Sequence, residues 1–145
     1  MKKIILAVIV VVLIGIQFIP VDQSVPEYTS SDLLVMSGAD ESMTNMIKDA
    51  CYDCHSYESE YPGYANVAPL SLWIQGHIDH GRGEMNFSTW GEMSNEDQQH
   101  LLKEAAEKVE KKEMPLTPFL ITHAEARITE DQRAEMAAWF RSKMN

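Results

Sequence analysis

The chain has 145 residues, with 12 basic against 22 acidic side chains and a formal charge of −10 at pH 7. This length suits one small domain with an appendage and is short for two ordinary domains. The acidic balance argues against nucleic-acid binding, which requires a basic surface.

The chain opens on an apolar segment, in which Lys2 and Lys3 precede a run over residues 4–19 broken by one glycine and one glutamine. This run is slightly longer than a usual signal-peptide core and shorter than the usual ~20-residue membrane span. Because no small-residue cleavage site follows closely, we expect residues 1–20 to form an N-terminal membrane-spanning helix, with a cleaved signal peptide as the alternative. The lysines favour a cytoplasmic N-terminus, so the rest would lie on the periplasmic side of a bacterial cytoplasmic membrane.

Residues 21–39 mix proline, serine and acids around one short apolar patch, residues 33–36. This composition predicts a linker, with the patch packed on the edge of the following domain. The domain itself is expected over residues 40–145. Without the two leader lysines, the exported part has 10 basic and 22 acidic residues, or −12.

The first two helices of the domain are predicted from capping residues and apolar spacing. Asp40 can cap a helix whose apolar positions Met43, Met46, Ile47 and Ala50 lead directly into Cys51. A second helix can open at Pro69 and stop at Gly81. The expected apolar face of this second helix comprises Leu70, Trp73, Ile74, His77 and Ile78.

Two further helices follow the same signals. Ser94 caps one whose inner positions include Leu101, Leu102, Ala105, Ala106 and Val109, and Pro115 ends it. Thr129 and Gln132 form a capping box for the last, which buries some of Met136, Ala137, Trp139 and Phe140.

No alternating β-type run is visible, so the domain should be all-α with about four helices. Its connections at 55–68, 81–93 and 114–128 are long for so small a domain. A flat apolar cofactor would account for these long connections, because they could fold around it.

The stretch CYDCH, residues 51–55, carries the chemistry. Two cysteines two residues apart with a histidine directly after them are typical of c-type haem attachment, in which Cys51 and Cys54 form thioethers and His55 coordinates the iron. A thioredoxin-type redox pair would follow a β-strand, and none is expected here. A zinc site from both cysteines with His77 and His80 departs from familiar spacings.

A covalently held haem needs a sixth ligand, and Met114 is the leading candidate because it ends a helix, precedes Pro115 and is followed by apolar residues that can wall the distal side. The other candidates are His77, His80, His100 and His123.

Arg82 follows the second predicted helix and could clamp a haem propionate, with the indole N–H of Trp73 or Trp90 as a further donor. A solvated loop arginine is an equally good interpretation of Arg82.

The sequence resembles a small bacterial haem-binding domain family, through CYDCHS at 51–56, EYPGYANVAPLSLWIQGHIDHGRGEMNFSTW at 60–90 and EMPLTPFLITHAEARIT at 113–129. The resemblance implies covalent haem. More distantly the chain is similar to class I cytochrome c, which implies that the first and last domain helices cross near the haem. That likeness also implies a backbone carbonyl, of Pro69 or Pro62, that orients the proximal imidazole.

These features predict a membrane-anchored monohaem cytochrome c, an all-α, cytochrome c-like electron carrier rather than an enzyme. It would hold one covalent haem c and dock transiently on redox partners with basic patches. The alternatives are a haem enzyme or gas or redox sensor with an open distal site, and a structural tether in which haem is only a scaffold.

Overall fold

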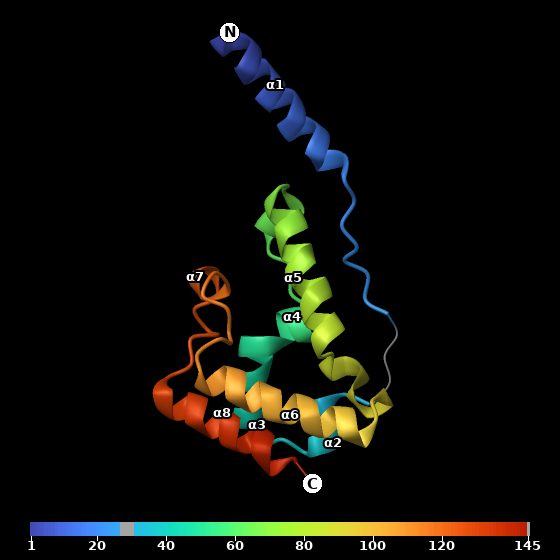
Figure 1. The fold of residues 1–145 in the computed structure, drawn as a ribbon, viewed down its shortest axis with the longest axis vertical. Coiled ribbons are helices and arrows are strands. Elements are labelled where there is room, and N and C mark those ends of the chain that lie inside the picture. The colour runs from blue at the N-terminus through green and yellow to red at the C-terminus, as the bar shows by residue number, and fades with distance from the viewer. Residues whose placement is uncertain (27–30, 145) are drawn as a thin grey trace.

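The computed structural model describes residues 1–26 and 31–144, and these residues form an all-helical structure (Figure 1). Residues 27–30 of the predicted linker and Asn145 of the predicted domain lie outside the described part. The α-helices are α1 (Lys2–Gly15), α2 (Leu33–Ser37), α3 (Glu41–Ile47), α4 (Asp53–His55), α5 (Leu70–Glu84), α6 (Asn95–Glu110), α7 (Phe119–Thr122) and α8 (Glu130–Ser142). The 3-10 turns are η1 (Ile16–Phe18), η3 (Gly63–Asn66) and η4 (Phe87–Glu92), and η2 (Lys48–Tyr52) is a π-helical turn.

The prediction of a membrane-spanning N-terminal helix is wrong. Helix α1 contains 14 residues, about 21 Å at 1.5 Å per residue, against a hydrocarbon core of about 30 Å. Its apolar run changes to the η1 turn after Gly15, and no helix in the described ranges is both long and apolar enough to cross a bilayer. The helix points away from the rest of the chain, and the Gln17 side chain joins it to the Ala68 backbone by two hydrogen bonds of 3.0 Å (Figure 1).

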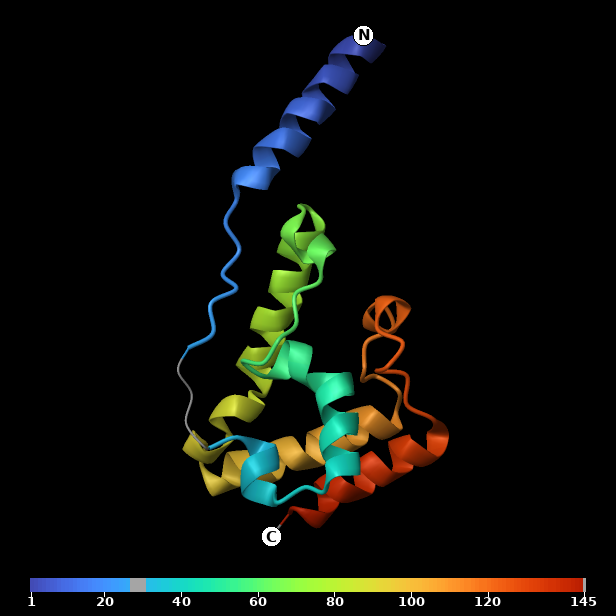
Figure 2. The same ribbon diagram turned by 180° about the vertical axis from the view of Figure 1, so that it is seen from behind.

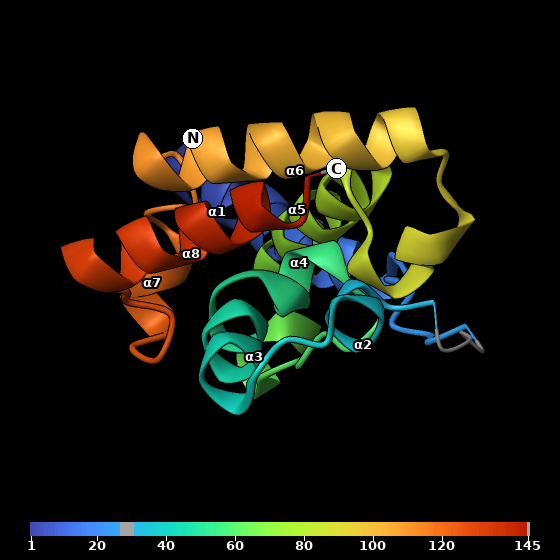
Figure 3. The ribbon, with the colours of Figure 1, turned by 90° about the horizontal axis from the view of Figure 1, so that it is seen from below.

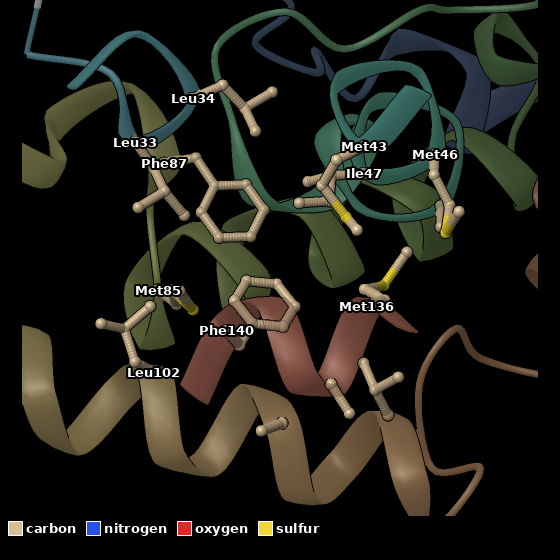
Figure 4. Packing of buried hydrophobic residues seen from close by; sticks show 14 of the residues in the cluster. Leu33, Leu34, Met43, Met46, Ile47, Met85, Phe87, Leu102, Met136 and Phe140 are labelled. Atoms are coloured by element: carbon tan, nitrogen blue, oxygen red, sulfur yellow. The ribbon is translucent and has the colours of Figure 1, made fainter. Parts of the chain in front are cut away.

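The core of the domain lies where α3, α6 and α8 meet. Helices α6 and α8 lie side by side, and α3 contacts α8 (Figure 3). Figure 4 shows Met43 and Ile47 of α3 facing Met136 and Phe140 of α8, all four nearly inaccessible to solvent. Burying side chains of this size contributes roughly 1.5–3 kcal/mol each, so this contact between the first and last helices of the domain is a main source of stability.

Three of the four predicted helix starts of the domain are confirmed by their side-chain caps. The Asp40 carboxylate accepts from Met43 N at 2.9 Å, the Ser94 hydroxyl accepts from Asp97 N at 3.1 Å, and Thr129 forms the predicted box with Gln132.

The apolar patch of the predicted linker is part of the domain core. Asp32 caps α2 by accepting from Leu34 N at 2.8 Å, and Leu33 and Leu34 are buried in the core cluster, where α2 contacts η4 (Figure 4). The Tyr52 hydroxyl donates to the same Asp32 carboxylate, at 2.8 and 2.9 Å from its two oxygens. This buried contact fixes α2 to the turn that carries the cysteines.

Helix α5 runs three residues past the predicted stop at Gly81, to Glu84. Its buried positions are Ser71, Ile78 and Gly81, whereas Leu70 and Trp73 of the predicted apolar face are half-exposed. Gly81 therefore packs within this helix and does not end it.

Short helical turns occupy the connections that were predicted to be long loops. The segment after α4 returns along α5 through η3, as Figure 2 shows, and the other two connections contain η4 and α7. The helices α5 and α7 project from the α6–α8 pair on the same side (Figure 1).

Candidate functional site

The CYDCH stretch lies on a helical turn, one face of which points into the core while the other lines a pocket. Cys51 ends η2 together with Tyr52, and Cys54 and His55 lie in α4. Tyr52 points into the core toward Asp32, and Cys51, Cys54 and His55 line a pocket. The i, i+3, i+4 spacing of these three residues explains why a single helical face presents them together.

The pocket is mostly apolar, and residues from nearly the whole domain line it. The turn around the cysteines forms one side, α5 and α6 form the flanks, and the segment from Met114 to Phe119 forms another wall. Polar groups lie among the lining residues, from α5 and α6. The full lining is Ala50, Cys51, Cys54, His55, His77, His80, Gly81, Glu84, Met85, Phe87, Leu101, Glu104, Ala105, Lys108, Val109, Met114, Pro115, Leu116, Phe119 and Phe140.

His55 is held as a neutral imidazole with one nitrogen available. Its Nδ1 lies 2.9 Å from the Met85 carbonyl oxygen. A carbonyl can only accept, so Nδ1 carries the proton and Nε2 retains its lone pair. Burial lowers the pKa of His55, which also favours the neutral ring. The orienting carbonyl was predicted at Pro69 or Pro62, and the structure places it at Met85, because α5 continues to Glu84 and brings the next residue beside the imidazole.

The two thiols are unpaired and partly accessible at the pocket wall. Burial against this wall raises the pKa of Cys51 to about 12 and that of Cys54 to about 11. They form no disulfide, and within the described ranges no three His, Cys, Asp or Glu side chains are grouped to hold a metal ion. The zinc set with His77 and His80 is therefore not assembled, although both histidines line the same pocket.

Met114, the leading candidate for the sixth ligand, lines the pocket, and so do His77 and His80. The structure places the other two candidates elsewhere. His100 is exposed, 3.7 Å from Glu104, and the His123 ring stacks on Phe119 outside the lining with a centroid separation of 3.9 Å.

The structure does not bring Arg82 or Trp73 to the pocket. The Arg82 Nε donates to the Ser56 carbonyl at 2.8 Å and its terminal nitrogen donates to the Ser59 hydroxyl at 3.0 Å, so this guanidinium braces the loop after the motif. Trp73 is 48% exposed and contacts His77 on the surface of α5. Sequence position alone had suggested that both lay near the cofactor.

Sequence reasoning missed Gly81 and Met85. A Cβ at Gly81 would lie 2.5 Å from the Cys54 carbonyl oxygen, so only glycine lets α5 approach the cysteine turn this closely. A glycine in mid-helix, interrupting an otherwise helical pattern, was the available signal. The role of Met85 is a backbone contact, which side-chain patterns do not reveal.

Comparison with known proteins gives one finding. A family model described as a haem-binding domain matches residues 11–142, which is most of the chain and includes the whole pocket. No curated protein and no solved structure matches the chain significantly.

Proposed function

The chain belongs to the haem-binding domain family, and from this premise we propose that it is a monohaem c-type cytochrome that carries one electron at a time between protein partners. The observation that carries the proposal is that two thiols, a neutral imidazole with a free Nε2 and a thioether all line one apolar pocket.

The chemistry of the lining residues fits a haem. A porphyrin is flat and apolar, and the pocket is walled by side chains such as Leu101, Phe119 and Phe140, from three different helices. Cys51 and Cys54 have the spacing that joins haem vinyl groups by thioether bonds. These contacts support covalent attachment of a single haem.

The bound haem iron would supply a one-electron couple between its ferrous and ferric forms. His55 holds its Nε2 lone pair for the iron, and the Met85 carbonyl keeps the imidazole in the required tautomer and orientation. Met114 offers its thioether from another wall of the pocket. With His55 as one ligand, a methionine as the second ligand would favour a higher reduction potential than a second histidine.

We propose electron transfer rather than catalysis because His55 and Met114, if both bound the iron, would leave no position open for a substrate. The remaining task of the protein is to exclude water and set the potential. The charge of −12 after the leader supports transient docking on partners with basic patches, whose association would slow as salt is added.

The N-terminal pattern supports a place of action outside the cytoplasm, because two lysines followed by an apolar run are typical of exported chains. Haem-stained bands of the periplasmic fraction after denaturing electrophoresis would test both the location and the covalent bond. Loss of the stain on denaturation would contradict covalent attachment.

The ligand set is tested by spectroscopy of the haem-loaded protein. Ferric haem with histidine and methionine ligands has a weak far-red band from sulfur to iron, which we expect in the wild type and expect Met114→Ala to abolish. The exposed Met144 lies outside the pocket, so Met144→Ala is the matched control and should keep the band. Rapid carbon monoxide binding to the untreated reduced wild type would instead favour an open distal site, with His77 as a neighbour of the bound molecule.

A further inference from the structure

Arg133 is a buried cation in a position that a helix does not favour. It lies in α8 four residues after the cap Thr129, where the positive end of the helix dipole opposes a cation. Its side chain is only 9% exposed. No ion pair to this guanidinium occurs within residues 1–26 and 31–144, and its Nε is buried without a hydrogen-bond partner. An arginine at such a position needs strong contacts elsewhere.

Those contacts are with the main chain of the turn that ends in Met114. One terminal nitrogen of Arg133 donates to the Val109 carbonyl at 2.6 Å and to the Met114 carbonyl at 2.7 Å. Hydrogen bonds from a charged donor are stronger than neutral ones. A single guanidinium nitrogen therefore ties the end of α6 to the main chain of Met114.

The turn itself has a demanding geometry. The Glu113 amide donates to the Lys108 carbonyl and the Lys112 amide donates to the Val109 carbonyl, the two bonds of a Schellman motif. Lys112 has φ of 61°, a left-handed conformation that usually requires glycine. The Met114 amide also donates to Lys108, at 3.2 Å. A lysine is strained in this conformation. A contact from another helix that holds the turn therefore stabilises it.

A role as a general link between α6 and α8 does not explain why Arg133 is buried and which acceptors it contacts. Arg141, on the same helix, already provides one, since its two terminal nitrogens contact the Glu110 carboxylate on the exposed side of α6. Arg133 differs because it is buried and because both of its acceptors belong to residues that line the pocket, Val109 and Met114.

We propose that Arg133 is a positioning residue that fixes the Met114 main chain, so that the thioether is kept within the pocket for the haem iron. This inference rests on the proposed ligation by Met114. Arg133 is not among the residues that line the pocket, and it acts through the two carbonyl oxygens.

The test compares three variants of the haem-loaded protein with the wild type. Arg133→Met keeps much of the apolar stem and removes the donors, Arg133→Lys keeps the charge without the planar fork, and Arg141→Met is the matched control on the same pair of helices. The measurements are amide hydrogen exchange of residues 112–114, the far-red sulfur-to-iron band, and the rate of carbon monoxide binding to the reduced form.

We expect Arg133→Met to speed exchange of these amides roughly ten- to a hundredfold, the factor for losing a hydrogen bond from a charged donor. The band should weaken and carbon monoxide should bind faster, with intermediate values for Arg133→Lys and wild-type values for Arg141→Met. If Arg133→Met does not fold, Arg133→Lys is judged by the same criteria.

The outcomes separate this inference from the proposed function. A wild type with the band and an Arg133 variant with unchanged exchange, band and carbon monoxide rate would overturn the positioning role alone. Faster exchange with an unchanged band would also overturn it, because the turn would then not control the ligand. A wild type without the band would overturn ligation by Met114 and, with it, this inference.

Discussion

Replacement of Gly81 by alanine tests how the pocket is assembled, because it adds one carbon where α5 meets the cysteine turn. The added Cβ would lie 2.5 Å from the Cys54 carbonyl oxygen, 3.1 Å from its carbonyl carbon and 3.3 Å from its Cβ. The nearest of these is a backbone atom, which no rotamer change can move away. Either α5 or the turn that carries both Cys54 and His55 must therefore shift.

The expected magnitude is the sum of two opposed effects. Glycine to alanine in a helix interior gains about 0.5–1 kcal/mol of unfolding free energy, and overpacking by one carbon costs about 1–3 kcal/mol. Gly76 and Gly83 lie in the same helix with no atom within 4 Å of an added Cβ, so alanine there should show the gain alone. Gly81→Ala should therefore be less stable than Gly76→Ala by about 1–3 kcal/mol.

Urea unfolding monitored by circular dichroism measures these differences, and the haem content of each purified variant shows whether the cysteine turn still assembles. We expect Gly81→Ala to carry less haem per chain than the two control variants. Equal stability and equal haem content in all three would refute the close approach of α5 to the cysteine turn.

Three other predictions follow from contacts around the site. Tyr52→Phe should lower the unfolding free energy by about 1–3 kcal/mol in urea, because the buried Asp32 carboxylate loses its hydroxyl donor, and an unchanged midpoint would argue against that hydrogen bond. With pKa values of about 12 and 11, Cys51 and Cys54 in the folded haem-free protein should stay protonated at pH values well above the ordinary thiol pKa of about 8.5. Iodoacetamide at pH 8 should therefore modify them more slowly than in urea by about two to three orders of magnitude, and equal rates would contradict the desolvation. Trp73→Ala should leave the haem-to-protein ratio unchanged, since the indole lies outside the pocket lining, and a loss of haem would restore a role for it there.

The features that the sequence predicted best are those that depend on residues close together in the chain. Asp40, Ser94 and Thr129 cap their helices as expected, because a capping side chain and the backbone amide that donates to it lie within three residues of each other. The grouping of the cysteines with His55 follows from helical spacing for the same reason.

Contacts between distant segments could not be predicted in this way. Arg82 suits a propionate by type and position, yet its guanidinium bonds Ser56 and Ser59, which only the fold brings near. Gly81 looked like a helix stop because its packing partner, the Cys54 backbone, is remote in sequence. The short α1 reflects a related limit, since an apolar run records composition and does not fix where a helix ends.

The pocket lining runs from Ala50, in the turn after α3, to Phe140 of α8, so its walls are complete only when these two segments have met. In that closed state the desolvated thiols are almost entirely protonated at neutral pH. Any chemistry that needs them as thiolates is therefore favoured while the chain is still open. If haem is attached through Cys51 and Cys54 as proposed, the thiols would therefore react more readily before α8 docks on α3 than after it.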